Sequence, residues 1–314
     1  MVSFFKRKKS INAGLGLGYC SGGVGFAQVV SKNGEMRLVQ LQYETFDDPE
    51  DITSQLKRMV SKSGIKGFAV NFVLAPNDYS VMQVEAPEVP DEELKSAIRW
   101  RVKDLLDFHI DDAEIEAITL PQSKRPGSPR LMYVIAAKTT RISEIVKQLS
   151  GSGLDIKAID IPELTLRNMT FADVEENRAT AFLYLSKDNS LIEICDNGAL
   201  CMSRHINMDF SSLSADSPES KMEVMDMLSL EIQRSLDYYE SQFANGSATK
   251  INMLSELPLS VAEFREVADS YLTAPVQPLG AMESIKGIDQ FDAELVARCM
   301  PAIGAAMRDF AWQA

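Results

Sequence analysis

One arrangement of short strands occurs twice in this chain of 314 residues, and it restricts the folds that the chain can adopt. Apolar side chains alternate with polar ones through residues 12–44 and again through residues 181–206, which predicts strands joined by tight turns. The expected strands are residues 12–19, 24–31 and 36–44 in the first half and 181–185, 190–196 and 199–206 in the second. A three-strand meander that recurs after intervening helices indicates a duplicated α/β unit. We therefore expect two lobes.

Helical periodicity and further apolar runs fill the segments between the meanders. Residues 218–243 carry an apolar stripe at helical spacing, which we interpret as a core-facing surface and not as a cofactor site. The other expected helices are residues 50–63, 90–105, 139–151, 260–270 and two terminal helices separated by Pro301. The other expected strands are residues 67–75, 80–85, 113–120, 130–137, 155–161, 250–254 and 274–277.

The charge balance argues against nucleic acid as a partner. Asp and Glu number 45 and Lys and Arg number 32, which gives a formal net charge of −13. Such a chain has no overall field that would attract a polyanion. The exception is Lys6-Arg7-Lys8-Lys9, which is expected either to be a solvated tail or to touch anionic lipid weakly. Glycines interrupt the uncharged stretch that follows, so we expect neither a cleavable signal nor a membrane span there.

The cysteines and histidines are too few and too dispersed for a zinc site. Cys20, Cys195, Cys201 and Cys299 show no CxxC spacing, and the chain has 2 histidines. We expect free thiols, a reducing compartment and therefore a cytoplasmic protein without a bound metal. The acidic pairs lie in polar stretches with no apolar context that would raise a carboxyl pKa, so we expect no catalytic residues.

Two segments resemble a known family. Residues 88–101, EVPDEELKSAIRWR, and residues 234–239, RSLDYY, are similar to segments of the PilM family of type IV pilus assembly proteins, and within it to the MshI group of MSHA pilus biogenesis. The resemblance implies an actin-like ATPase fold of the α/β class: a ribonuclease H-like meander, duplicated into two lobes, with an inserted subdomain. The implied parts are a basic tail at 1–10, a first lobe at 11–172 with the subdomain at about 80–150, a second lobe at 173–286 and C-terminal helices at 287–314.

The family's nucleotide site is expected to be degenerate here. Where the family has an acid in its first phosphate turn this chain has Gly16, and where it has a second acidic turn this chain has residues 186–188, SKD. Where a Gly pair should pass under adenosine, residues 252–257 read NMLSEL. The vestigial cleft is expected to include Gly16, Gly18, Ser21, Ser186, Asp188 and Ser255. The alternative is that Asp188 or Asn189 holds magnesium through water and Glu256 meets a ribose, so ATP with magnesium stays open as a cofactor.

The resemblance implies a cytoplasmic adaptor, peripheral to the inner membrane, that binds the N-terminal tail of a PilN-like inner-membrane pilus protein. The residues expected at the partner groove are Phe72, Val73, Val84, Arg99 and Trp100. Trp100 could instead pack within the subdomain, and self-association is a further expectation. Two other functions remain open: an ATP-hydrolysing actin-like pilus assembly ATPase, and a membrane-associated filament former resembling FtsA.

Overall fold

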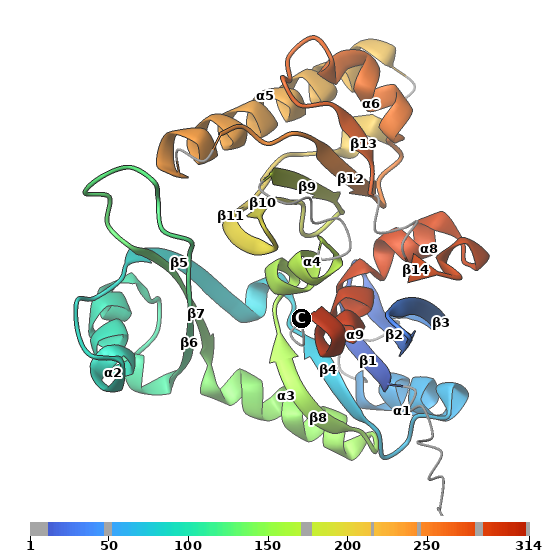
Figure 1. The fold of residues 1–314 in the computed structure, drawn as a ribbon. Helices are drawn as coiled ribbons and strands as arrows, with labels where there is room; N and C mark the ends of the chain where they lie inside the picture. Colours follow the sequence, from blue (N-terminus) through green and yellow to red (C-terminus); the bar gives the residue numbers. More distant parts are fainter. Residues whose placement is uncertain are drawn as a thin grey trace, which may run out of the picture.

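The computed structural model describes residues 12–46, 52–170, 178–214, 217–243, 246–279 and 285–311. Within them the strands form three sheets (Figure 1). The first has the order β14-β3-β2-β1-β4-β8, with β1 Asn12–Cys20, β2 Gly23–Lys32, β3 Glu35–Thr45, β4 Ala69–Val73, β8 Asp155–Asp160 and β14 Ile285–Lys286. The second has the order β11-β10-β9-β12-β13, with β9 Ala179–Leu185, β10 Leu191–Asp196, β11 Ala199–His205, β12 Ile251–Ser255 and β13 Val276–Pro278. The third has the order β5-β7-β6, with β5 Tyr79–Glu85, β6 Ala113–Thr119 and β7 Leu131–Lys138.

The first two sheets repeat one pairing scheme. In the first sheet β1 pairs antiparallel with β2 and parallel with β4. In the second sheet β9 pairs antiparallel with β10 and parallel with β12. Each strand that the sequence predicted in the two meanders is present, with ends within two residues of the expected ones. The duplication that the alternation predicted is therefore present in the pairing.

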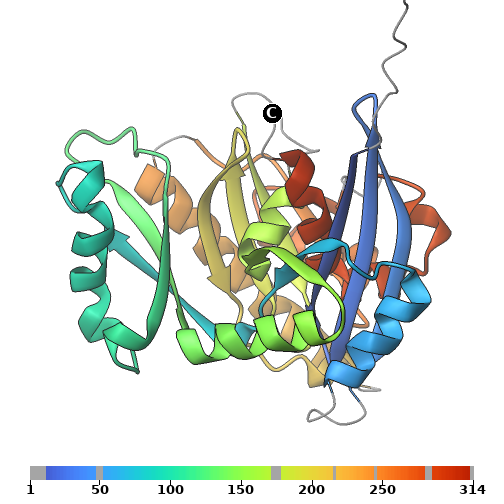
Figure 2. The ribbon, with the colours of Figure 1, turned by 90° about the horizontal axis from the view of Figure 1, so that it is seen from below.

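The side chains of β1 explain how the first sheet is covered. Leu15 and Leu17 are buried against α1 (Ile52–Ser63) and α3 (Thr139–Gly151), which lie along the same face of the sheet (Figure 2). Gly14 and Gly16 point to the opposite face, where α9 (Met300–Ala311) packs directly on the strand. Alternation along a strand sends successive residues to opposite faces. The glycines therefore admit a helix backbone on one side while the leucines fill a core on the other.

The second sheet is covered in the same manner. α5 (Pro218–Phe243) and α6 (Val261–Ala268) pack on one face, and the predicted stripe of α5, including Leu228, Ile232 and Tyr239, is buried there. The other face meets α4 (Pro162–Thr170), α8 (Ala293–Arg298) and α9. Of these helices, α4 and α9 lie between the two sheets (Figure 1). The prediction that the α5 stripe belongs to the core is confirmed.

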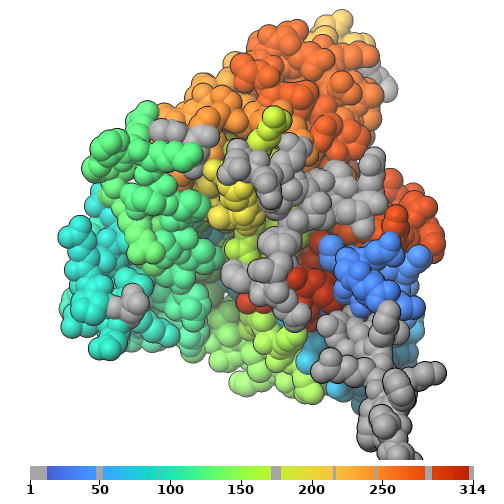
Figure 3. Space-filling view, in the orientation of Figure 1, coloured from blue at the N-terminus to red at the C-terminus, as the bar shows by residue number. Residues whose placement is uncertain are grey.

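The third sheet projects to one side of the two lobes, as the space-filling view shows (Figure 3). Its outer face is covered by α2 (Asp91–Val102), through contacts that include Ile98 and Val102. The β6–β7 loop reaches the second lobe, where Ser123 Oγ donates a hydrogen bond to the carbonyl of Gln242 at 2.5 Å and the Lys124 N–H donates to the carbonyl of Phe243 at 3.0 Å. The third sheet is thereby attached to the end of α5 as well as to the first sheet.

Some features differ from the sequence expectations. α4 and β14 were not predicted, and Pro301 lies in the first turn of α9 instead of between two helices, because the break falls at Cys299. The basic segment at 6–9 lies outside the described residues. In the part of the chain that the structure describes, no helix combines the length and apolar character needed to cross a membrane.

Candidate functional site

Three chain segments meet in a cleft between the lobes. They are the β1–β2 turn at Ser21, the β9–β10 turn at residues 186–190, and the end of β12 at Glu256. A cavity of about 370 Å³ opens at this point. Its lining residues are Tyr19, Cys20, Ser21, Gly22, Phe46, Ala75, Pro76, Asn77, Pro162, Tyr184, Ser186, Asp188, Asn189 and Pro301. The two meanders of the duplicated fold therefore present their first turns to one shared space.

The carboxylate of Glu256 joins the two turns. Ser21 Oγ donates a hydrogen bond to Glu256 Oε1 at 2.5 Å, and the backbone N–H of Lys187 donates to the same oxygen at 2.7 Å. Glu256 is 6% exposed, and its Oε2 has no hydrogen-bond partner among the described residues. We call this set of contacts the Glu256 bridge. It places a negative charge between the two turns and connects the first lobe to the second.

The backbone of the second turn is satisfied by the turn itself. The N–H of Ser186 donates to Ser190 Oγ at 3.0 Å, and the N–H of Asn189 donates to Ser186 Oγ at 2.9 Å. Since Glu256 takes the N–H of Lys187, three backbone donors of this turn already have acceptors. A turn binds phosphate through such backbone N–H groups when they are free to face the anion. In this chain they point instead at side chains of the protein.

These residues do not fit a magnesium triphosphate. No Lys, Arg or His is among the described residues that line the cavity, and the Glu256 carboxylate would repel phosphate oxygens. At the end of β12, Ser255 Oγ accepts from the N–H of Leu257 at 3.0 Å, so a side chain closes the turn at this point. No three His, Cys, Asp or Glu side chains of the described residues come together in a way that could hold a metal ion.

The predicted cleft residues divide into two groups. Ser21, Ser186 and Asp188 line the cavity, whereas Gly16, Gly18 and Ser255 do not. Gly16 lies within β1 beneath α9, and Gly18 lies beside Val73 of the neighbouring strand. β1 continues to Cys20, so the turn that reaches the cleft starts at Ser21. The structure places both glycines where the backbone packs closely inside the first lobe.

Removing the Glu256 side chain tests the bridge. Glu256→Ala should lower the free energy of unfolding by about 2 kcal/mol, because a partly buried N–H and a hydroxyl lose a charged acceptor. Urea denaturation measures this change. Glu266→Ala, an exposed position on α6, is the matched control and should change stability by less than about 0.5 kcal/mol. Equal effects of the two substitutions would show that the bridge does not connect the lobes.

A second hollow lies between the third sheet and the first. This groove has a volume of about 460 Å³ and is floored mainly by aliphatic side chains. Its lining residues are Leu74, Glu114, Ile115, Glu116, Ala117, Ile118, Ile135, Ala137, Ile142, Ile159, Asp160, Ile161, Leu164 and Arg308. They come from β6 and β7 on one side and from β8, α3, α4 and α9 on the other. We call this hollow the β6 groove.

Two sheet edges border the β6 groove. β6 is an end strand of the third sheet and β8 is an end strand of the first, within the described residues. Five consecutive residues of β6, 114–118, line the groove, so backbone as well as side chains faces it. An edge strand presents N–H and C=O groups that can pair with another extended chain. The groove therefore combines an apolar floor with an edge that is able to accept a strand.

The wall of the β6 groove opposite β6 holds an ion pair. Arg308 Nη1 lies 2.6 Å from Asp160 Oδ2, and the Asp160 side chain is 1% exposed. Burial raises the pKa of Asp160, while the neighbouring Arg308 opposes that rise. The pair joins α9 to the end of β8 and fixes that wall. The pair also neutralises the positive charge of Arg308, which would otherwise face the groove.

No protein-family model matches the chain, and no curated protein matches it in sequence. One chain of a solved PilM–PilN type IV pilus biogenesis complex superposes with a TM-score of 0.71 at 16% identity, over 94% of this chain and 98% of that chain. The chain has an actin-like ATPase fold.

Two further structures agree on the fold. The cytoplasmic domain of EpsL, an inner-membrane component of the Vibrio cholerae type II secretion system, gives a TM-score of 0.50 at 13% identity, over 91% of this chain and 98% of that one. A Bacteroides thetaiotaomicron protein with an actin-like ATPase fold and unknown function gives 0.50 at 12% identity, over 94% and 99%. At these identities the likeness shows the fold, and it confirms the fold class that the sequence predicted.

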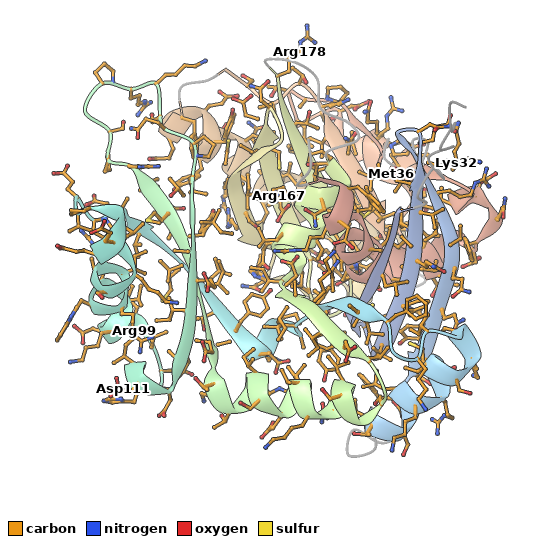
Figure 4. The ribbon with its side chains drawn as sticks, turned by 60° about the horizontal axis from the view of Figure 1, so that its bottom comes forward. Lys32, Met36, Arg99, Asp111, Arg167 and Arg178 are labelled. Carbon is orange, nitrogen blue, oxygen red and sulfur yellow. The ribbon has the colours of Figure 1, made fainter. Side chains whose placement is uncertain are left out.

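Within this actin-like fold, the five residues predicted at the partner groove do not form one site, although Arg99 and Trp100 line a common hollow of about 390 Å³. Phe72 and Val73 are 2% and 0% exposed in the core of the first lobe, and Val84 is buried beneath α2. Arg99 donates to the carbonyls of Ile110 and Ala113 on the outer side of the third sheet, where Figure 4 shows it near Asp111. Trp100 is 75% exposed on the same side. None of the five lines the β6 groove.

Sequence reasoning placed Ser21, Ser186 and Asp188 at the cleft, but it missed the bridging role of Glu256 and the residues of the β6 groove. Glu256 had been weighed as a ribose contact, and its position between the turns depends on pairing of β12 with β9, which no local pattern reveals. The β6 residues carried a usable signal. Glu114, Ile115 and Glu116 alternate charged and apolar side chains, which is typical of a strand with one covered and one open face.

Proposed function

We propose that this chain is a non-catalytic adaptor of a type IV pilus assembly complex of the MSHA type, acting at the cytoplasmic side of the inner membrane. It captures the N-terminal cytoplasmic tail of a PilN-like membrane protein in the β6 groove. The observation that carries the proposal is the groove itself, in which an apolar floor lies beside an open strand edge. The similarity to a chain of the PilM–PilN complex supports this partner.

Capture of an extended tail follows from strand addition. A tail that pairs with β6 satisfies its main-chain groups along the edge, and alternate side chains enter the apolar floor between Ile142 and Leu164. Main-chain pairing supplies affinity that is independent of sequence, whereas the floor selects for side chains. The tail needs no structure of its own beforehand. Such an arrangement suits a short segment next to a membrane anchor.

The cleft between the lobes then has a structural role. The Glu256 bridge holds the two turns together through protein groups, so closure of the lobes requires no nucleotide. Ser21, Ser186 and Asp188 are the remnant of the nucleotide site in this proposal. An ATP-hydrolysing relative would need free backbone donors and a metal-holding acid at the same turns. We also propose the division into lobes at 11–172 and 173–286, with the subdomain at about 80–150.

Hydrogen exchange tests where the tail binds. On addition of a peptide with the N-terminal cytoplasmic sequence of a PilN-like protein, amides of residues 113–119 should exchange at least about tenfold more slowly, because strand pairing protects them. Residues 91–102 of α2 lie on the outer face and serve as the internal control. Protection of α2 without protection of β6 would place the partner elsewhere and reject the proposal.

A further inference from the structure

We propose that the β6 groove selects a segment with two basic side chains, two residues apart, followed at the same spacing by an apolar one. The inference rests on the proposed function, since it specifies what the captured tail must carry. It follows from the direction of the β6 side chains, from the charges of the groove lining and from the geometry of strand pairing. None of these observations was part of the sequence expectations for the partner site.

The side chains of β6 separate into two sets. Ala113 and Ile115 are buried in the cluster beneath α2. By alternation, Glu114, Glu116 and Ile118 point to the opposite face of the sheet, which is the face that borders the groove. On that face they stand beside Ala137, Ile135 and Tyr133 of β7, their paired residues. Two carboxylates and one aliphatic side chain thus form the open edge of the groove in the order 114, 116, 118.

The lining carries an excess of negative charge. Its charged members are Glu114, Glu116, Asp160 and Arg308, three carboxylates against one guanidinium, which gives a net charge of −2. Asp160 and Arg308 neutralise each other in their ion pair. The remaining charge belongs to Glu114 and Glu116, both of which are exposed. Thr139 Oγ1, at 3.5 Å from Glu114 Oε1, is a weak and neutral contact. The free charge of the groove therefore lies along one edge of the strand.

Strand pairing converts this edge into a sequence preference. Side chains directly opposite each other on paired strands lie about 5 Å apart, and opposite charges there stabilise the pair. Residues of an added strand that face Glu114 and Glu116 are two apart and point into the groove. Lys or Arg at these positions places its charge near a carboxylate while its methylene stem lies on the apolar floor. The next residue on that face meets Ile118, where an apolar side chain fits.

Acidic residues on an edge strand have another ordinary use, which is to discourage pairing with other chains. If the two glutamates only discourage pairing, every added strand should pair weakly with β6, and acidic strands should pair most weakly. The spatial arrangement argues for selection instead, because the two carboxylates border an apolar floor of about 460 Å³ that pairing would cover. A strand that brings two cations neutralises the edge and covers the floor in one step. Selection predicts that a basic strand binds to β6, whereas protection of the edge predicts that it does not.

Two synthetic peptides test the preference. The basic peptide contains Leu-Thr-Lys-Val-Lys-Thr-Leu and the acidic peptide contains Leu-Thr-Glu-Val-Glu-Thr-Leu, each with a fluorescent label. Both patterns read the same in either direction, so they fit parallel and antiparallel pairing. Fluorescence anisotropy at low salt should show the full-length chain binding the basic peptide about tenfold more tightly, and raising NaCl to about 0.5 M should reduce that ratio.

Charge reversal provides the decisive comparison. The double variant Glu114→Lys, Glu116→Lys should prefer the acidic peptide by a similar factor, because both side chains are exposed and the floor is unchanged. The matched control, Glu92→Lys with Glu93→Lys on α2, should keep the wild-type preference, since these residues do not line the groove.

The outcomes separate the inference from the proposed function. If wild type binds both peptides equally well and the reversal changes nothing, the tail is captured without charge selection, and the inference alone fails. If wild type binds neither peptide and the PilN-like tail also fails to bind, the groove is not a strand-capture site and both proposals fail. If wild type refuses both peptides but binds the PilN-like tail, the basic pattern is not what the groove selects, and the inference again fails alone.

Discussion

Replacing Gly16 with alanine is expected to remove a large part of the stability of this chain. A Cβ atom at this position would lie 1.9 Å from the carbonyl oxygen of Ala302 and 2.5 Å from the backbone nitrogen of Ala306. Both atoms belong to the backbone of α9, so no side-chain rotation relieves the collision. Overpacking against movable side chains already costs about 1–3 kcal/mol. Gly16→Ala should therefore cost at least about 3 kcal/mol of a total that is about 5–15 kcal/mol.

Two buried side-chain hydrogen bonds hold α9 in place against the sheet. The Asn71 side-chain amide donates to the carbonyl of Ala305 at 3.0 Å, and that of Asn168 donates to the carbonyl of Gly304 at 3.1 Å. Shifting α9 by the distance that a methyl group needs would break both of these buried bonds. Because these bonds join α9 to β4 and α4, the destabilisation would extend to both elements as well as to β1. Urea denaturation followed by circular dichroism measures the change.

Gly151→Ala is the matched control. Gly151 ends α3, and its new Cβ would meet Thr53 Cγ2 at 3.9 Å, an ordinary contact. Alanine favours helix over glycine by up to about 1 kcal/mol, so this variant should be as stable as wild type or slightly more stable. A Gly16→Ala protein that unfolds at the wild-type urea concentration would contradict the close approach of α9 to β1.

Ile142→Lys is expected to abolish capture of the partner tail. Ile142 is half-buried on α3 and lines the floor of the β6 groove. A bound tail would cover the new ammonium group, and burial of an unpaired charge costs several kcal/mol. The inferred basic residues of the tail would add repulsion. We expect the affinity to fall about 100-fold or more, and calorimetric titration with the tail peptide measures it.

Val146→Lys controls for the added charge. Val146 lies one turn further along α3, is 38% exposed and does not line the groove. Because a surface lysine there displaces nothing that a tail would touch, binding should stay within about threefold of wild type. Similar losses in both variants would indicate a general electrostatic effect, and an unchanged affinity in Ile142→Lys would exclude this groove as the binding site.

The long helix that the sequence predicted, α5, and the helix that it missed, α4, differ in how they are buried. α5 shows a clear stripe because one face meets the sheet and the other meets solvent. α4 has no such stripe, since it lies between the two sheets and buries polar residues. Glu163, for example, accepts a hydrogen bond from Tyr79 at 2.8 Å and lies 3.1 Å from His205. Hydrophobic periodicity identifies helices that have one buried face, but it does not identify helices that are buried on all sides.

The candidate sites show the same limit of local patterns. Glycine at position 16 permits close approach of any backbone, and the sequence does not tell whether the neighbour is a phosphate or a helix. The sequence shows Gly16 in place of the acid expected at the first turn, but the Glu256 bridge joins residues that lie 235 apart in the chain. The β6 groove depends on how the third sheet sits beside β8. Each site is produced by long-range packing.

The central claim is that the β6 groove, and not the cleft between the lobes, is the working site of this protein. Isothermal titration calorimetry of the full-length chain with the tail of a PilN-like protein, and separately with magnesium and ATP, tests it most directly. The account predicts saturable binding of the tail at one site and no binding heat from magnesium ATP. Saturable binding of magnesium ATP, lost in Asp188→Ala, together with no binding of the tail would contradict it.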